Sequence, residues 1–167
     1  MPTKADITSS IAKELRIITH LAGKLQPQHL SFRFTPGQRS TQELLEYLAI
    51  TSEAAVTALL TGKSAIWGEL AKAATGLPLA RFAATIATQQ QTVEKLLAPF
   101  NEADFAAKRV KNGQGVELPL AEALFEGLAK QLVGYKTQLF LQAKAAGVAG
   151  LGSANLWRGE DAAAKAG

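Results

Sequence analysis

The sequence contains no cysteine and only two histidines, His20 and His29. The absence of cysteine excludes disulfide frameworks, cysteine-ligated zinc or iron–sulfur centres and cysteine nucleophiles. Two histidines cannot supply a three-histidine metal site from one copy of the chain. Aromatic residues make up 7% and charged residues 19% of the 167 residues, whereas 47% are hydrophobic, a composition typical of a folded globular protein. We therefore treat residues 1–167 as a single domain.

The sequence also lacks the features of proteins that bind nucleic acids or membranes. The net charge of +4 is spread along the chain, and the single tight basic group is Lys108, Arg109 and Lys111, so we expect no nucleic-acid partner. No apolar run approaches the ~20 residues of a membrane span. The N-terminal ten residues have no apolar segment of the kind found in secretory signals. These patterns predict a cytoplasmic protein with no membrane partner.

Apolar residues recur every three or four positions along most of the chain, and strong helix formers such as Ala, Leu, Gln, Glu and Lys dominate. This periodicity predicts long helices over residues 6–24, 79–97 and 120–146. Another long helix is bounded by two local signals. Ser40, with Glu43 three residues later, forms a capping box at its start, and Gly62 provides a left-handed C-terminal cap.

The segments between the long helices predict smaller elements. A short extra helix is expected over residues 64–74. The pair Asn112-Gly113 carries a hairpin signal, so an irregular or hairpin-like segment precedes the last long helix. Residues 158–167 are expected to form a flexible tail. The sequence therefore predicts an all-α four-helix bundle with a short extra helix and a hairpin-like insertion.

Catalytic templates are missing. There is no Gly-x-Ser-x-Gly, no Gly-x-Gly-x-x-Gly, no P-loop and no His-Glu-x-x-His. The neighbouring carboxylates Glu102 and Asp104 are interpreted as capping or solvated groups rather than an acid/base pair. His20 lies nearly opposite the apolar stripe of its helix and is interpreted as a plain surface histidine, whereas the role of His29, in a loop, is left open. No catalytic residue is assigned.

A polar stripe runs along the last long helix, within ~60° on a helical wheel. It consists of Gln131, Tyr135, Gln138 and Gln142. The apolar face of the same helix, ~90° away on that wheel, is formed by Phe125, Leu128, Leu132 and Leu139. The stripe therefore lies at the edge of the core, where a cleft between helices could open. The alternative is a boundary stripe whose side chains reach solvent, and periodicity alone favours that alternative.

Two segments resemble the DinB/YfiT-like family of four-helix-bundle proteins. Residues 34–49, FTPGQRSTQELLEYLA, are similar to that family's approach to helix two, a Pro-Gly-x-x-Ser loop followed by Glu-Leu-Leu and then His-Leu/Ile-Ala. Residues 131–147, QLVGYKTQLFLQAKAAG, are similar to its helix four, a His-x-x-x-His-Arg-Gly-Gln-Leu run that ends before glycine. The order and separation of the two segments agree with the family, and the resemblance covers most of the chain. It implies a bundle of DinB/YfiT-like type.

The resemblance also implies where a metal would bind. Family members hold one divalent metal through three histidines, one on helix two and two at i and i+4 on helix four. Carried over to this sequence, these positions are Tyr47, Gln131 and Tyr135, and none is histidine. A neutral amide and two neutral phenols are poor metal ligands. We therefore expect no metal, no cofactor and none of the family's metal-dependent thiol chemistry, but a polar pocket with Gln138 and Gln142 as neighbours.

Three hypotheses for the function stand beside one another. The first is a DinB-like protein without metal-dependent activity, whose polar pocket between helices binds a small molecule. The second is a thiol transferase or hydrolase of the family type with an altered site, in which Tyr47 and Tyr135 are the only general acids and, with a pKa near ~10, poor bases. The third is a non-catalytic interaction protein. A homodimer formed through helix faces is also expected.

Overall fold

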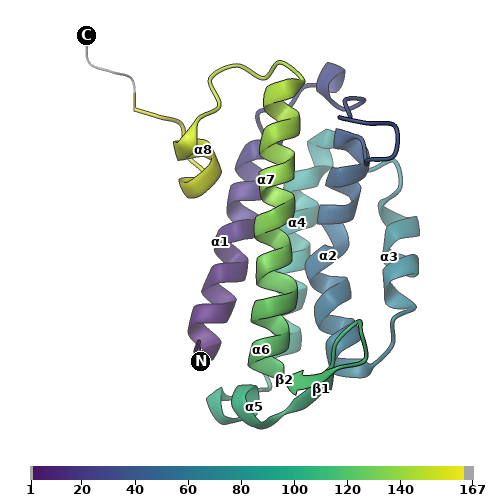
Figure 1. Cartoon of the computed structure of the whole chain (residues 1–167), viewed down its shortest axis with the longest axis vertical. Helices are drawn as coiled ribbons and strands as arrows, with labels where there is room; N and C mark the ends of the chain where they lie inside the picture. The colour runs from purple at the N-terminus through teal and green to yellow at the C-terminus, as the bar shows by residue number, and fades with distance from the viewer. Residues whose placement is uncertain (1, 164–167) are drawn as a thin grey trace.

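Four long helices lie side by side in the computed structural model, which describes residues 2–163 (Figure 1). They are α1 (Lys4–Ala22), α2 (Thr41–Thr61), α4 (Leu79–Leu97) and α7 (Lys130–Ala145). Helices account for most of the described chain, which confirms the all-α prediction.

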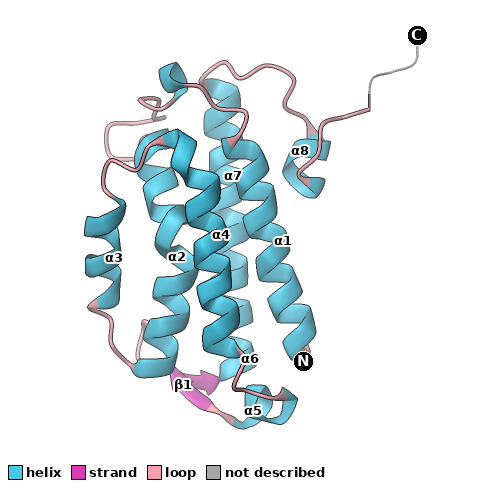
Figure 2. Ribbon diagram, turned by 180° about the vertical axis from the view of Figure 1, so that it is seen from behind, coloured by secondary structure: helices cyan, strands magenta, loops and turns pink. Residues whose placement is uncertain are grey.

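Shorter elements surround the long helices. They are η1 (Pro27–His29), α3 (Ile66–Ala74), α5 (Glu102–Ala107), β1 (Arg109–Lys111), β2 (Glu117–Pro119), α6 (Leu120–Glu122), η2 (Ala123–Ala129) and α8 (Ser153–Arg158). Helix α3 packs on α2, whereas α8 packs on α1, at the opposite side of the molecule (Figure 2). The two short strands lie at one end of the long helices, close to the end of α2 (Figures 1 and 2).

Capping chemistry sets the helix boundaries. The Ser40 hydroxyl accepts a hydrogen bond from the Glu43 N–H at 3.2 Å, and the Glu43 carboxylate accepts one from the Ser40 N–H at 2.6 Å. Gly62 has a φ of 71°, so α2 ends in the left-handed cap that the sequence predicts. Asn101 and Asp104 form the same box at the start of α5, which agrees with the interpretation of Asp104 as a capping residue.

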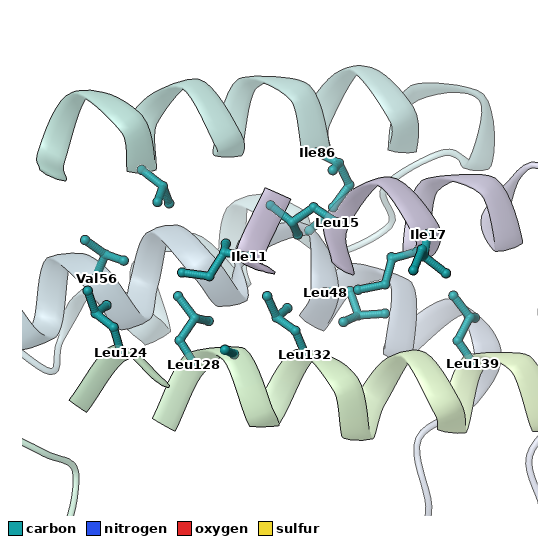
Figure 3. Close-up of a cluster of buried hydrophobic side chains, with 14 of the residues drawn as sticks. Ile11, Leu15, Ile17, Leu48, Val56, Ile86, Leu124, Leu128, Leu132 and Leu139 are labelled. Atoms are coloured by element: carbon teal, nitrogen blue, oxygen red, sulfur yellow. The ribbon is translucent and has the colours of Figure 1, made fainter. Parts of the chain in front are cut away.

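The hydrophobic core fills the space between the long helices (Figure 3). Each long helix contributes side chains that are almost completely removed from water, which is the main favourable term in folding. Those labelled in Figure 3 are Ile11, Leu15, Ile17, Leu48, Val56, Ile86, Leu124, Leu128, Leu132 and Leu139.

Helix α2 is the most apolar of the four long helices. By length and composition alone it could cross a membrane, with a mean hydropathy of 1.3 over its most apolar stretch. No uninterrupted apolar run marks this stretch in the sequence, because Thr51 and Ser52 divide it. Half of the stretch is buried inside the protein, where α2 packs against α3, α4 and α7. Its apolar character therefore matches that of a core helix.

The last predicted long helix contains an irregular turn. It runs from Leu120 to Ala145, but Ala123–Ala129 within it is π-helical. Because a π turn takes more residues than an α turn, a wheel drawn at α-helical spacing loses the correct phase there. The wheel placed Phe125 on the apolar face, whereas Leu124 is completely buried and Phe125 is only half-buried. Hydrophobic periodicity gives no warning of such a turn.

The predicted hairpin is present, but its turn is wider than expected. Strands β1 and β2 pair antiparallel. The connection covers residues 112–116 rather than two residues, with the Asn112 N–H donating to the Val116 carbonyl at 2.9 Å. Gly115, with a φ of 78°, is the left-handed residue of this turn, and Gly113 is not.

Helix α8 covers His20, so the interpretation of His20 as a plain surface histidine is wrong. The His20 side chain is only 18% exposed, and its Nε2 atom lies 3.0 Å from Asn155 Nδ2. Gly159 lies so close to α1 that a Cβ atom there would meet the Ile17 Cα at 3.1 Å. The wheel of α1 treated its outer side as solvent, which is why it missed this contact.

The segment beyond α8 is described as far as residue 163. The Arg16 guanidinium donates to the Arg158 carbonyl at 2.8 Å, and Lys24 Nζ donates to the Asp161 carboxylate at 2.6 Å. Of the expected flexible tail, 158–167, the first residues therefore contact α1. Residues 164–167 lie outside the described part of the chain, as does residue 1.

Candidate functional site

Tyr47, Gln131 and Tyr135 meet between α2 and α7. Gln131 Nε2 donates a hydrogen bond to the Tyr47 hydroxyl oxygen at 2.7 Å. The Tyr47 and Tyr135 rings meet edge to face, with centroids 4.9 Å apart and planes at 62°. All three side chains are half-buried. The structure thus brings together the three positions that the resemblance singled out, and we call these three residues the polar cluster.

Two residues that sequence reasoning did not single out pack on the polar cluster. The guanidinium carbon of Arg39 lies 4.2 Å from the Tyr47 ring centroid and 5.8 Å from that of Tyr135. Trp67, at the start of α3, stacks on Tyr47 with centroids 5.9 Å apart and planes at 19°. Arg39 directly precedes the cap of α2 and Trp67 belongs to a short helix, so only tertiary packing reveals their position.

The other two glutamines of the stripe behave differently. Gln142 is completely buried, and its Nε2 donates to the Arg39 carbonyl at 2.8 Å. Gln142 therefore anchors the loop from which Arg39 reaches Tyr47, and its Oε1 has no hydrogen-bond partner within residues 2–163. Gln138 is half-buried and makes no hydrogen bond to the polar cluster in the same range. Neither residue lines the cleft described below.

A glutamine from α4 holds the backbone of α2 just after Tyr47. The Gln89 side chain is 1% exposed. Its Nε2 donates to the Leu48 carbonyl at 3.0 Å, and its Oε1 accepts from the Ser52 N–H at 2.6 Å. These are the two backbone groups that would pair with each other in an uninterrupted helix. The amide is thus inserted into the hydrogen-bond ladder of α2, one of the recognised causes of local helix distortion.

The Tyr47 phenol stays protonated in this environment. Burial raises its pKa above the ordinary value of 10.0, and the neighbouring Tyr135 phenol raises the pKa further. The Arg39 guanidinium acts in the opposite direction without reversing the shift. A phenol with a raised pKa is neutral at physiological pH, so Tyr47 serves as a hydrogen-bonding group rather than as a base or an anionic metal ligand.

The donor atoms of the polar cluster do not suit a transition metal. The cluster offers one amide and two phenols, whereas zinc and nickel sites are built from imidazole, thiolate and carboxylate. Over residues 2–163, no three His, Cys, Asp or Glu side chains gather in a way that could hold a metal ion. The arrangement is suited instead to hydrogen bonding and aromatic contact.

A cleft of about 390 Å³ opens beside the polar cluster. It lies between the second half of α2, the start of α3, the hairpin turn and the π-helical segment, and Gln131 and Trp67 border both the cleft and the cluster. The remaining lining residues are Ala55, Ala58, Leu59, Gly62, Ser64, Lys111, Asn112, Gly113, Ala123, Gly127 and Leu128.

Small residues on both walls keep this cleft open. Ala55 and Ala58 face it from α2, and Ala123 and Gly127 face it from the π-helical segment. Short side chains leave the space between the helix backbones unfilled, where larger ones would close it. The π-helical turn sits in the same wall, and single π turns inside α-helices are frequent at functional sites.

Neither the protein-family models nor the curated proteins with which the chain was compared give a match. The likeness to DinB/YfiT proteins therefore rests on the residues of the two segments and stays a prediction.

Proposed function

We propose that this protein binds a small organic molecule in the cleft beside Gln131, and that it is a DinB/YfiT-like bundle without the metal chemistry of that family. One observation carries the proposal: Gln131 borders the cleft and is at the same time held by Tyr47 at 2.7 Å. A volume of about 390 Å³ falls in the usual range of ligand pockets, and apolar walls with a few fixed polar groups are typical of them.

Gln131 is prepared to recognise a ligand. Its Nε2 is engaged by Tyr47, whereas its Oε1 has no hydrogen-bond partner among the described residues. Tyr47 is in turn held by contacts with Arg39 and Trp67. The amide therefore offers a hydrogen-bonding atom whose position is fixed before binding, and such preorganisation lowers the entropic cost of association. The raised pKa of Tyr47 counts against the hypothesis of an enzyme with an altered site, since it removes the nearest general base.

A fragment screen observed by NMR tests the proposal. We expect binding fragments to shift the side-chain resonances of Gln131 and Trp67. Ala58→Phe fills the cleft and should abolish those shifts. The matched control is Ala98→Phe, which places the same ring in a groove of similar size, about 360 Å³, between α1 and α4. Fragments that bind only that groove, or that still bind the Ala58→Phe variant, would contradict the proposal.

The DinB/YfiT-like part of the proposal has its own test. Tyr47→His, Gln131→His and Tyr135→His together place three imidazoles where the polar cluster now lies, and three nitrogens with one water satisfy zinc. We expect the triple variant to bind zinc in calorimetric titration, with modest affinity because no second set of groups orients the rings. Zinc binding equal to that of the wild-type chain would show that the three positions do not serve as a ligand set.

A homodimer through the outer side of α7 is supported by a separate observation. Val133 and Leu141 lie about two turns apart on this helix and are 36% and 48% exposed. We place the expected contact between two copies at these residues, where pairing would bury their apolar surface. We expect a dimer by sedimentation velocity and a monomer after Leu141→Glu. Val116→Glu, at an equally exposed residue of the hairpin, is the control and should leave the mass unchanged.

A further inference from the structure

The hairpin end of the cleft presents hydrogen-bond donors without acceptors. Lys111 lines the cleft, its side chain is exposed, and within residues 2–163 it forms no salt bridge. The neighbouring cations of this region are engaged elsewhere: Arg109 pairs with Glu117, and the Lys108 ammonium lies over the Phe100 ring at 5.1 Å. Lys111 is thus the cation that this end of the cleft has available.

The Asn112 side chain adds donors of fixed direction. Its Oδ1 accepts from the Gln114 N–H at 3.0 Å and from the Val116 N–H at 2.9 Å. An amide nitrogen could not accept these bonds, so the orientation of the amide is determined and Nδ2 is the free group. The Gly113 N–H, also in the cleft lining, has no partner in the described chain. Ammonium, amide N–H and backbone N–H together match an anion.

The rest of the cleft matches an apolar body. No aspartate or glutamate lines it, so nothing there repels an anion. Its walls are aliphatic or aromatic between the hairpin and Gln131, where burial of carbon atoms supplies the affinity. The lining side chains of this middle part are Ala55, Ala58, Leu59, Trp67, Ala123 and Leu128.

We infer that the occupant of the cleft is an amphiphilic monocarboxylate, with its carboxylate at Lys111, Asn112 and Gly113 and its apolar chain or ring reaching toward Gln131. This inference rests on the proposed function and names its ligand class. A carboxylate is favoured over a phosphate because one lysine neutralises one negative charge. A phosphate dianion would leave a second negative charge without a cation at this end of the cleft.

The test compares octanoate with octanamide, which share a shape and differ in charge. The test uses a Trp157→Phe variant. In this variant Trp67 in the cleft wall is the only tryptophan, so its fluorescence emission reports binding. We expect octanoate to bind about tenfold more tightly than octanamide, because hydrogen bonds to a charged group are the stronger ones. Added salt should reduce this preference. Lys111→Met should abolish it, whereas Lys108→Met, a lysine of the same basic group outside the cleft, should leave it intact.

The outcomes separate this inference from the proposed function. Equal binding of both probes overturns the carboxylate assignment while the small-molecule proposal stands. A preference that survives Lys111→Met, or tighter binding of octyl phosphate than of octanoate, also overturns it. Failure of both probes, together with a fragment screen that leaves Gln131 and Trp67 unshifted, overturns the two proposals at once. A charge preference that Lys111→Met alone removes supports both.

Discussion

Two neighbouring residues of α7, Tyr135 and Lys136, face opposite regions of the molecule that handle buried polarity differently. Tyr135 joins the neutral polar cluster on the α2 side. Lys136, 1% exposed, points toward α1, where its ammonium lies 2.6 Å from the Glu14 carboxylate. The Trp157 ring of α8 covers that ammonium at 4.9 Å from the ring centroid. One side of α7 is therefore closed over a charge pair, and the other opens on a cleft.

The difference teaches which polar groups are available for function. On the α1 side, each charge has its partner and α8 excludes water, so the groups are consumed by the fold. On the α2 side, Gln131 and the hairpin turn keep hydrogen-bonding atoms without partners in the described chain, and a cavity adjoins them. These atoms are half-buried or exposed, so they remain free to bond a ligand that enters the cleft.

The largest expected effect on stability comes from removing one member of the buried ion pair between α7 and α1. Lys136→Met leaves the Glu14 carboxylate buried at 6% exposure without a partner. Removal of one member of a buried ion pair typically costs about 3–5 kcal/mol of unfolding free energy. Urea denaturation should show this loss, while ligand binding in the cleft, on the other side of α7, stays unchanged.

The matched variant is Glu14→Leu together with Lys136→Met. Replacement of both charges by apolar groups of similar volume is often neutral or stabilising. A double variant as unstable as Lys136→Met would show that the ion pair itself, rather than the unpaired carboxylate, stabilises the fold.

Part of this difference between the two sides of α7 could be predicted from the sequence. Helix positions and the α2 caps were predictable, because each depends on local periodicity or on capping residues. The convergence of the polar cluster was expected only from the resemblance to DinB/YfiT-like proteins. Glu14 and Lys136 also had a readable signal, since opposite charges occupy core positions of two predicted helices, between Ile11 and Ile18 on α1 and between Leu132 and Leu139 on α7.

Other features could not be predicted from the sequence. The π-helical turn at Ala123–Ala129 depends on what α7 packs against, because an extra residue in one turn is stable only when tertiary contacts accommodate it. The insertion of Gln89 into α2 joins residues 41 positions apart, and the stacking of Trp67 on Tyr47 joins two helices across a loop. The cleft results from all of these tertiary contacts together, so no local sequence pattern predicts it.

A smaller loss of stability is expected from a change in the polar cluster. Tyr47→Phe removes the hydroxyl that accepts from Gln131 and should cost about 0.5–1.5 kcal/mol in unfolding free energy. Tyr135→Phe is the matched control, because it removes a phenol beside Tyr47 but leaves the bond from Gln131 to Tyr47 in place, and should cost less stability. Comparison of the two variants by urea denaturation decides the point. Equal losses would mean that the bond to Gln131 does not distinguish the two phenols.

The packing of α8 on α1 depends on His20 being neutral. Asn155 Oδ1 accepts from the Gly152 N–H, and Asn155 Nδ2 donates both to Asp161 and to His20 Nε2. The amide orientation is therefore fixed, and His20 Nε2 must be an acceptor. A protonated imidazole would present an N–H to the Asn155 donor.

The smallest expected effect is a pH dependence of this closure. Burial lowers the pKa of His20 below 6.5, with Lys24 and Arg16 acting in the same direction and Asp161 and Glu160 against it. Because the docked state disfavours the proton, its stability is complete above pH 6.5 and decreases as pH falls toward the lowered pKa. In a Trp67→Phe protein titrated from about pH 8 to about pH 5, Trp157 emission should therefore stay constant above pH 6.5 and report release of α8 below it. His20→Gln keeps a hydrogen-bond acceptor for Asn155 but does not titrate, so Trp157 emission in that variant should stay constant over the same pH range. Identical emission profiles for the two proteins would rule out His20 as the group that controls the packing of α8.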